Sequence, residues 1–108
     1  MFSRIVQCNL KNNRLDEARQ AFSTEVIPNL RKQPGFVDVV ESLDAQTGQF
    51  VCMTLWRTRE DADRYGQTEF NRIVPKVRDF INGEPTVNTL QVETSTIHNI
   101  AKGKQAAA

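Results

Sequence analysis

The side chains able to transfer a proton or attack a substrate are few in this chain. Asp38 and Glu93 lie near the ends of predicted strands, where an inward-facing carboxyl would have a raised pKa and act as a general base. The alternative is that both are solvated charges. Cys8 and Cys52 are expected on opposite faces of a sheet, as two buried thiols without a disulfide, and neither has a histidine partner for nucleophilic chemistry. No spaced group of cysteines and histidines predicts a metal site.

The overall charge balance excludes several classes of partner. The 108 residues include 14 basic and 13 acidic side chains, so no net field points to nucleic acid or to an acidic membrane surface. The first residues lack the basic and apolar regions of a signal peptide, and no apolar segment approaches the roughly 20 residues that cross a bilayer. We therefore expect a cytoplasmic protein without a membrane segment, in a reducing compartment that suits two unpaired cysteines.

Four predicted strands alternate with two helical regions. Residues 44–48 have the Asp and Gly of a short hairpin loop, so the strands on either side of this loop should pair antiparallel. The order is β-α-β-β-α-β, the ferredoxin-like pattern of an α+β domain whose helices cover one face of an antiparallel sheet. We assign this domain to residues 2–98 and expect residues 99–108 to form a flexible tail. The expected strands are residues 2–10, 36–43, 50–56 and 86–97.

Each of the two helical regions contains a proline. An apolar stripe over residues 15–30 predicts the first helix, and Pro28 should kink or tighten its last turn. Thr58 is the expected N-cap of the second region, which covers residues 59–81 in two or three pieces. Pro75 is expected to open the last of these pieces as its first residue.

Two helices can cover only one face of such a sheet, and the other face is expected to be open. The residues that we assign to the open face are too apolar for contact with solvent, yet they include polar groups that a plain core would exclude. We therefore predict a homodimer in which two open faces enclose a partly polar cavity. We assign Val6, Cys8, Leu10, Val39, Val51, Met53, Leu55, Leu90 and Val92 to the covered face. The open face receives Ile5, Gln7, Asn9, Phe36, Asp38, Val40, Phe50, Cys52, Thr54, Trp56, Gln91 and Glu93.

A family resemblance rests on two short motifs and on the order of the elements. The motifs are Leu-Trp-Arg-Thr-Arg-Glu-Asp-Ala at residues 55–62 and the Pro-Gly-Phe turn at residues 34–36. Together they resemble the antibiotic biosynthesis monooxygenase family over residues 2–97. The resemblance implies a dimeric α+β barrel. Some members oxidise phenolic or quinol-like substrates with dioxygen and no cofactor, some open haem, and many have no known activity.

The resemblance also implies roles for three side chains. In cofactor-free members an Asn and a Trp orient an aromatic substrate and stabilise its anion, and Asn9 and Trp56 resemble that pair. If the first and third strands are neighbours, these two side chains lie close together on one face. Tyr65 would line the cavity and pass a proton to a bound oxygen species. Alternatively, Trp56 anchors the strand-helix junction, Asn9 ends its strand and Tyr65 packs at the edge of the core.

Haem opening is the activity that the sequence supports less well. Members with this activity use a histidine on the second helix, and that position falls near Pro75 here. Neither helical region contains a histidine, and the single one, His98, follows the final strand. Without an axial ligand, haem opening loses its main support.

Two functions therefore remain open. The first is a cofactor-independent monooxygenase that acts on a small phenolic or quinone-like compound in a dimer cavity. The second is a non-catalytic dimeric module of the same fold that holds a small ligand or a partner. An RNA-binding ferredoxin-like domain is disfavoured because the aromatic-basic strand motif is missing. The residues expected to contact the substrate, besides Asn9, Trp56 and Tyr65, are Gln7, Phe36, Asp38, Phe50, Thr54, Gln91 and Glu93.

Overall fold

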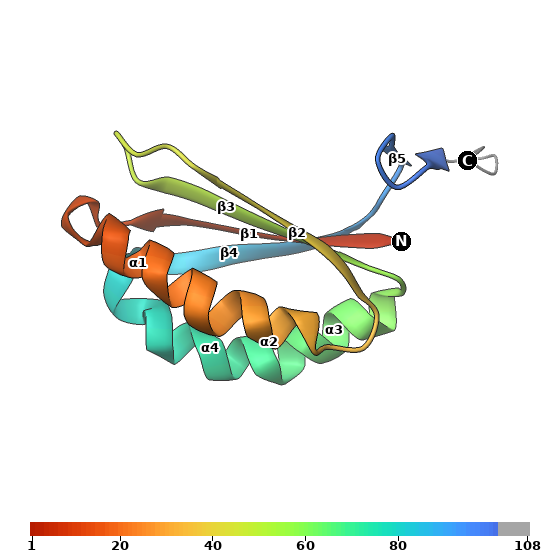
Figure 1. Ribbon diagram of the computed structural model, residues 1–108, viewed down its shortest axis with the longest axis horizontal. Helices are drawn as coiled ribbons and strands as arrows, with labels where there is room; N and C mark the ends of the chain where they lie inside the picture. Colours follow the sequence, from red (N-terminus) through yellow and green to blue (C-terminus); the bar gives the residue numbers. More distant parts are fainter. Residues whose placement is uncertain (102–108) are drawn as a thin grey trace.

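The computed structural model describes residues 1–101 and contains a four-stranded antiparallel sheet with helices on one face (Figure 1). The strand order is β2-β3-β1-β4, so β1 and β3 are the inner strands. The predicted α+β, ferredoxin-like β-α-β-β-α-β arrangement is confirmed. Its strands are β1 (Phe2–Leu10), β2 (Phe36–Leu43), β3 (Gln49–Trp56) and β4 (Ile81–Gln91).

The first helical run widens ahead of its proline. It consists of η1 (Asn12–Arg14), α1 (Leu15–Ala21), the π-helical η2 (Phe22–Val26) and α2 (Ile27–Arg31). Pro28 has no N–H to donate, and its ring would clash with the carbonyl four residues earlier in a regular helix. A π segment relieves this conflict because its turn is wider. The last turn after Pro28 is tightened as expected, because the backbone N–H groups of Lys32 and Gln33 donate to carbonyls three residues earlier, Asn29 O at 3.1 Å and Leu30 O at 3.0 Å.

The second helical run is broken at Thr68. It consists of α3 (Arg59–Gln67), α4 (Glu69–Val77) and η3 (Arg78–Phe80), so the prediction of two or three pieces is confirmed. Thr58 caps α3 as expected, because its Oγ1 accepts the backbone N–H of Asp61 at 3.1 Å. Pro75 lies inside α4 and does not open a new helix, because the helix restarts at Glu69.

Strand β4 begins five residues earlier than the sequence suggested, and it contains a bulge. Three residues of β1, from Gln7 to Asn9, lie opposite five residues of β4, from Asn82 to Thr86. Gly83 has a φ of 76° within this bulge, a conformation that glycine adopts without strain. The Asn-Gly pair at residues 82–83 thus lies within β4, at the bulge.

The face assignment of β3 is wrong by one residue. Cys52 pairs with Val6, and Phe50 pairs with Cys8, so these side chains share the face that the helices cover. Phe50, Cys52, Thr54 and Trp56 therefore face the helices, while Val51, Met53 and Leu55 face the other way. The face assignment is also wrong at the ends of the neighbouring strands. Phe36 pairs with Trp56 and Gln91 with Phe2, so both lie on the covered face. Leu90 pairs with Ser3 and lies on the open face. Asp38, Val39 and Val40 keep the faces predicted for them.

The last described residues form a small hairpin on the side of the sheet opposite the helices (Figure 1). It pairs β5 (Thr94–Ser95) with β6 (Ile100–Ala101). His98 Nε2 lies 3.2 Å from Asp38 Oδ2 and joins the hairpin to β2. Residues 100 and 101 are therefore paired in a strand, and the rest of the predicted tail, residues 102–108, lies outside the described part. No helix within residues 1–101 has the length and apolar character that a membrane span requires.

Candidate functional site

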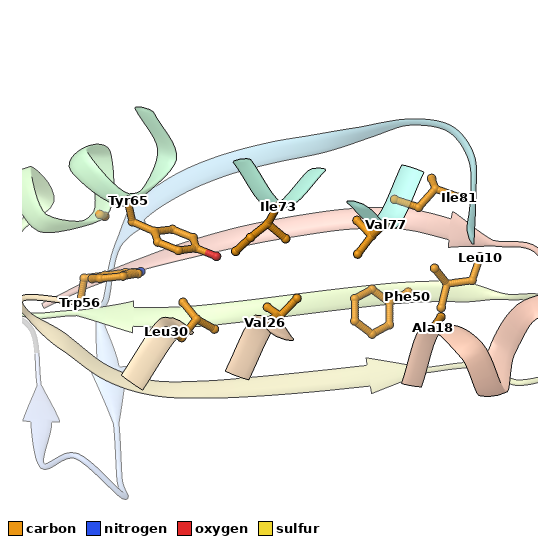
Figure 2. Packing of buried hydrophobic residues seen from close by; sticks show 11 residues of the cluster. Leu10, Ala18, Val26, Leu30, Phe50, Trp56, Tyr65, Ile73, Val77 and Ile81 are labelled. Atoms are coloured by element: carbon orange, nitrogen blue, oxygen red, sulfur yellow. The ribbon is translucent and has the colours of Figure 1, made fainter. Parts of the chain in front are cut away.

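A small apolar cavity of about 50 Å³ lies between the covered face of the sheet and the helices. Strands β1 and β3 form its floor, and the two helical runs form its walls, as the close-up of the core shows (Figure 2). Three side chains with N–H or O–H donors reach this largely apolar space: Arg4, Tyr65 and Thr54, whose hydroxyl is already engaged because it donates to the backbone carbonyl of Arg4. Apolar residues of its lining include Val26, Leu30, Phe50, Phe70, Ile73 and Val77.

Arg4 is a buried cation on the central strand β1. It is 6% exposed, and its Cζ lies 4.1 Å from the ring centre of Phe70 and 5.5 Å from that of Tyr65. Burial lowers the pKa of its guanidinium, but an arginine keeps its charge at any physiological pH. None of the ion pairs within residues 1–101 includes Arg4. In the part of the chain that the structure describes, the rings of Phe70 and Tyr65 are the contacts that stabilise this charge.

Gly66 provides the space that the Arg4 guanidinium occupies. A Cβ at this position would lie 3.1 Å from both Nε and Nη2 of Arg4. These distances are shorter than ordinary van der Waals contact, so any larger residue would press on the guanidinium. The glycine in α3, which weakens the helix, thus permits the close approach of a cation on β1.

Tyr65 carries the second donor of the cavity. It is 4% exposed, and its ring centre lies 5.1 Å from that of Trp56 (Figure 2). Burial raises the pKa of its phenol to about 12, so the hydroxyl stays protonated at neutral pH. No hydrogen bond within residues 1–101 engages this hydroxyl. Tyr65 is therefore suited to donate a hydrogen bond or a proton, and it is not suited to act as a base.

Trp56 is fully buried behind Tyr65. Its Nε1 donates a hydrogen bond of 2.8 Å to Thr54 Oγ1, and the ring of Phe36 packs edge-on at 5.7 Å. Because Thr54 already accepts the indole N–H, that group is not available to a ligand. This geometry corresponds to the interpretation of Trp56 as an anchor of the strand-helix junction.

The predicted site residues are divided between two faces of the sheet. Phe50, Thr54 and Tyr65 line the cavity. Gln7, Asn9 and Asp38 lie on the opposite face, because their pairing partners on β3 are Val51, Gln49 and Leu55. Gln91 ends β4, and Glu93 follows it; both are exposed. Asp38 is therefore not a base within this cavity; it lies on the open face, to which the sequence assigned it.

The prediction that Asn9 and Trp56 lie close together is wrong. Trp56 pairs with Phe2, seven residues along β1 from Asn9, which corresponds to about 23 Å at the rise of a strand. The two inner strands are neighbours as expected, but they run antiparallel, so the two residues occupy opposite ends as well as opposite faces.

The two cysteines share a face, contrary to the prediction. Cys8 and Cys52 both line the cavity. Burial raises the pKa of both thiols, and that of Cys52 reaches about 12. Both are therefore protonated and weakly nucleophilic at neutral pH. Within residues 1–101 no cluster of three or more His, Cys, Asp or Glu side chains could hold a metal ion.

Arg4 is the residue that sequence reasoning missed, although a signal for it exists. Val6, Cys8 and Leu10 alternate along β1 and were assigned correctly to the covered face. Extending that alternation by two residues places Arg4 on the same face. A charged residue on a core face is unusual enough to mark a candidate site.

The structure is similar in fold to several solved structures. An antibiotic biosynthesis monooxygenase is 24% identical, with a TM-score of 0.71, over 85% of this chain and 98% of its own. The chain has the fold of these monooxygenases. A Mycobacterium tuberculosis protein is 16% identical with a TM-score of 0.70, over 88% of this chain and 97% of its own.

A third similar structure contains a ligand. It is the monooxygenase from the ActVA-Orf6 gene of Streptomyces coelicolor in complex with nanaomycin D, 12% identical with a TM-score of 0.70, over 87% of this chain and 88% of its own. The family resemblance predicted from the motifs at residues 34–36 and 55–62 is thus confirmed at the level of the fold. No family profile matches the sequence, and no curated protein is similar to it in sequence.

Proposed function

We propose that this protein is a monooxygenase that oxidises a small phenolic or quinol-like compound with dioxygen and without a bound cofactor. The observation that supports this function is the pair of unengaged donors, Arg4 and the Tyr65 hydroxyl, at the wall of an apolar cavity in a monooxygenase fold. The site would lie between sheet and helices within one protomer, and not between the open faces of two protomers.

The reaction needs an electron-rich ring and a stabilised oxyanion. A phenol that reacts with one O₂ to give a quinone loses its O–H and one ring C–H hydrogen; one oxygen atom joins that ring carbon, and the other leaves as water with both hydrogens. The phenolate form reacts more readily because it gives up electrons more easily. The apolar wall would exclude water from the ring, while Arg4 and Tyr65 would stabilise negative charge on oxygen.

The size of the cavity sets a condition on this function. A cavity of about 150 Å³ accommodates benzene, whereas the space here is about 50 Å³. The present cavity has room for a molecule the size of water or dioxygen, and a ring requires side chains of the wall to move. Phe70 is placed to do so, because it lies directly after the helix break at Thr68 and covers Arg4.

Oxygen uptake measured together with Trp56 fluorescence tests this proposal. The chain has one tryptophan, so a panel of phenols and naphthols changes a signal with a single source. We expect quenching with oxygen consumption, both reduced at least about tenfold in Tyr65→Phe through loss of a donor at the oxyanion. Ser23→Ala removes an exposed hydroxyl as the matched control. Quenching by the panel without oxygen uptake would contradict the monooxygenase.

A second candidate function, binding without turnover, is favoured by one observation. No Asp, Glu or His side chain lines the cavity within the described residues, so a bound neutral phenol has no base to receive its proton. A ligand-binding module needs no such base. The same titration separates the two functions, because a module gives saturable quenching and no oxygen consumption.

We also propose a homodimer formed through the open face of the sheet. Val40 is 45% exposed and Leu90 is 54% exposed on this face, and Val51 and Met53 lie between them on β3. With Ile5 of β1, which pairs with Met53, these residues form an apolar stripe across four strands, and such a stripe is typical of a face that a second copy covers. Gln7 and Asn9 would then contact the partner and not the cavity.

A further inference from the structure

Within residues 1–101, Arg4 is a buried charge without a counter-charge. An arginine removed from water loses its hydration, and cation–π contacts such as those with Phe70 and Tyr65 offset only part of that loss. Buried arginines are as a rule paired with a carboxylate or another anion. The isolated chain thus carries a charge arrangement that an anion would complete.

The nearby carboxylates of the protein are engaged elsewhere. Asp63, whose charge acts on Arg4 from a distance, lies 3.8 Å from Arg59. Glu69, on the other side of the helix break, pairs with Arg72 at 3.1 Å. Among residues 1–101 no acidic side chain forms an ion pair with Arg4, so the anion has to come from outside the protomer's own core.

We propose that the cavity binds its ligand as an anion, an aromatic ring that carries a carboxylate or a phenolate oxygen, with that oxygen on the Arg4 guanidinium. Gly66 lies against the Nε and Nη2 edge, and the guanidinium lies over the ring of Phe70, so a ligand would approach Arg4 from the cavity that this residue helps to line. The acidic group would meet the guanidinium by charge-assisted hydrogen bonds. The ring would lie on the apolar wall that Phe50 and Ile73 help to form.

This inference rests on the proposed function for the identity of the ligand as a substrate, and it resolves the missing base. A phenol that enters already ionised needs no general base in the cavity. Arg4 then selects the reactive form of the substrate, because a phenolate is both the species that binds and the species that reacts with dioxygen. A substrate with an acidic hydroxyl, or with a carboxylate beside it, fits this site best.

Calorimetric titration of the full chain under anaerobic conditions tests the anion preference. Benzoate and benzamide have nearly the same shape and differ in charge. We expect benzoate to bind roughly 10- to 100-fold more tightly, the usual effect of hydrogen bonds to a charged group. A nitrophenol titrated in its neutral and ionised forms extends the test and distinguishes a phenolate from a carboxylate site.

Three variants assign the preference to Arg4. Arg4→Met should remove the difference between benzoate and benzamide, while Arg4→Lys, which keeps a charge, should retain part of it. Gly66→Ala should weaken benzoate binding by crowding Nε and Nη2. Arg31→Met removes an exposed cation and should leave the ratio unchanged. Circular dichroism shows whether Arg4→Met is folded; if it is not, the Lys and Ala variants decide.

The outcomes of this test and of the oxygenase test are separable. Equal affinity for benzoate and benzamide, no binding of either compound, or a preference that persists in folded Arg4→Met would each overturn the inference. Anion preference without oxygen uptake by any phenol would leave the inference standing and remove the monooxygenase. Oxidation of neutral phenols without anion preference would leave the monooxygenase standing and overturn the inference.

Discussion

The indole N–H of Trp56 is bonded to Thr54, the residue two positions earlier on the same strand, at 2.8 Å from Nε1 to Oγ1. Thr54 in turn donates its hydroxyl to the backbone carbonyl of Arg4 at 3.3 Å. A fully buried tryptophan, a buried threonine and the central strand are thereby linked by two hydrogen bonds. The indole N–H of Trp56 and the hydroxyl of Thr54 therefore both have hydrogen-bond partners. The guanidinium of Arg4 and the hydroxyl of Tyr65 have no such partner within residues 1–101.

Loss of the Thr54 hydroxyl should destabilise the protein. Thr54→Val keeps the shape of the side chain but leaves the buried Trp56 N–H without an acceptor, which costs about 1–3 kcal/mol of unfolding free energy. Urea unfolding followed by circular dichroism measures the change. Thr54→Ser keeps the acceptor and should lose less, so equal stability of the Val variant and the wild type would refute this role.

Removal of the Arg4 charge should stabilise the ligand-free protein. Arg4 is 6% exposed and forms no ion pair within residues 1–101, and replacing buried charge by an apolar side chain of similar volume commonly adds about 1 kcal/mol or more. Arg4→Met should therefore unfold at a higher urea concentration than the wild type. A large loss of stability would show that the cation–π contacts with Phe70 and Tyr65 outweigh desolvation.

Tyr65 should titrate far above an ordinary tyrosine. Its pKa is raised to about 12 from 10.0, so between these values the folded state holds the proton more tightly than the unfolded state does. The unfolding free energy therefore falls as pH rises through this window. The chain has one tyrosine, so tyrosinate absorbance reports on Tyr65 alone.

The control for this titration is Tyr65→Phe, which should give no absorbance change and should lose the corresponding fall in stability. If the pKa of Tyr65 in the folded wild-type protein were near 10, the hydroxyl would be open to solvent.

The cysteines should react slowly with alkylating reagents. Burial raises the pKa of Cys52 to about 12 from 9.0 and also raises that of Cys8, so the thiolate fraction near neutral pH is very small. Mass spectrometry should show modification of both thiols only after urea is added. Because both line the cavity, a bound ring should slow the reaction further, whereas fast labelling of the native protein would contradict the described burial.

A charge on the open face should dissociate the proposed dimer. Leu90 is 54% exposed and faces away from the helices, so Leu90→Glu should shift the protein to monomers in analytical ultracentrifugation. Val87 lies on the same strand but pairs with Val6 on the other face, and it is 40% exposed, which makes Val87→Glu the matched control. A wild-type protein that is monomeric at all concentrations would exclude this interface.

The sequence predicts the order of the elements well but not the orientation of β3. Turn residues, an N-cap and two apolar stripes mark where strands and helices lie, and all of these are local signals. Phe50 to Trp56 is apolar on both faces, so its alternation carries no information, and a shift of one residue exchanges the faces. The pairing of Cys52 with Val6 decides the orientation, and that contact depends on the whole sheet.

The candidate site was predicted in part for the same reason. Tyr65, Phe50 and Thr54 reach the cavity, although two of them were assigned to the wrong face. Asn9 is separated from Trp56 because β1 and β3 run antiparallel, a relation that residue types alone do not express. Arg4 was open to prediction, because the alternation of β1 already carries it to the covered face.

The charge of the cavity and the shape of its wall come from different parts of the fold. The cation comes from β1, an inner strand fixed on both sides by β3 and β4, whereas most of the apolar wall comes from helices that contain a π segment and a break at Thr68. Substitutions at Phe70, Ile73 or Val74 can therefore change the outline of an accepted molecule without altering its required sign of charge. For protein engineering, the sheet is the constant part of this receptor and the helices are its adjustable part.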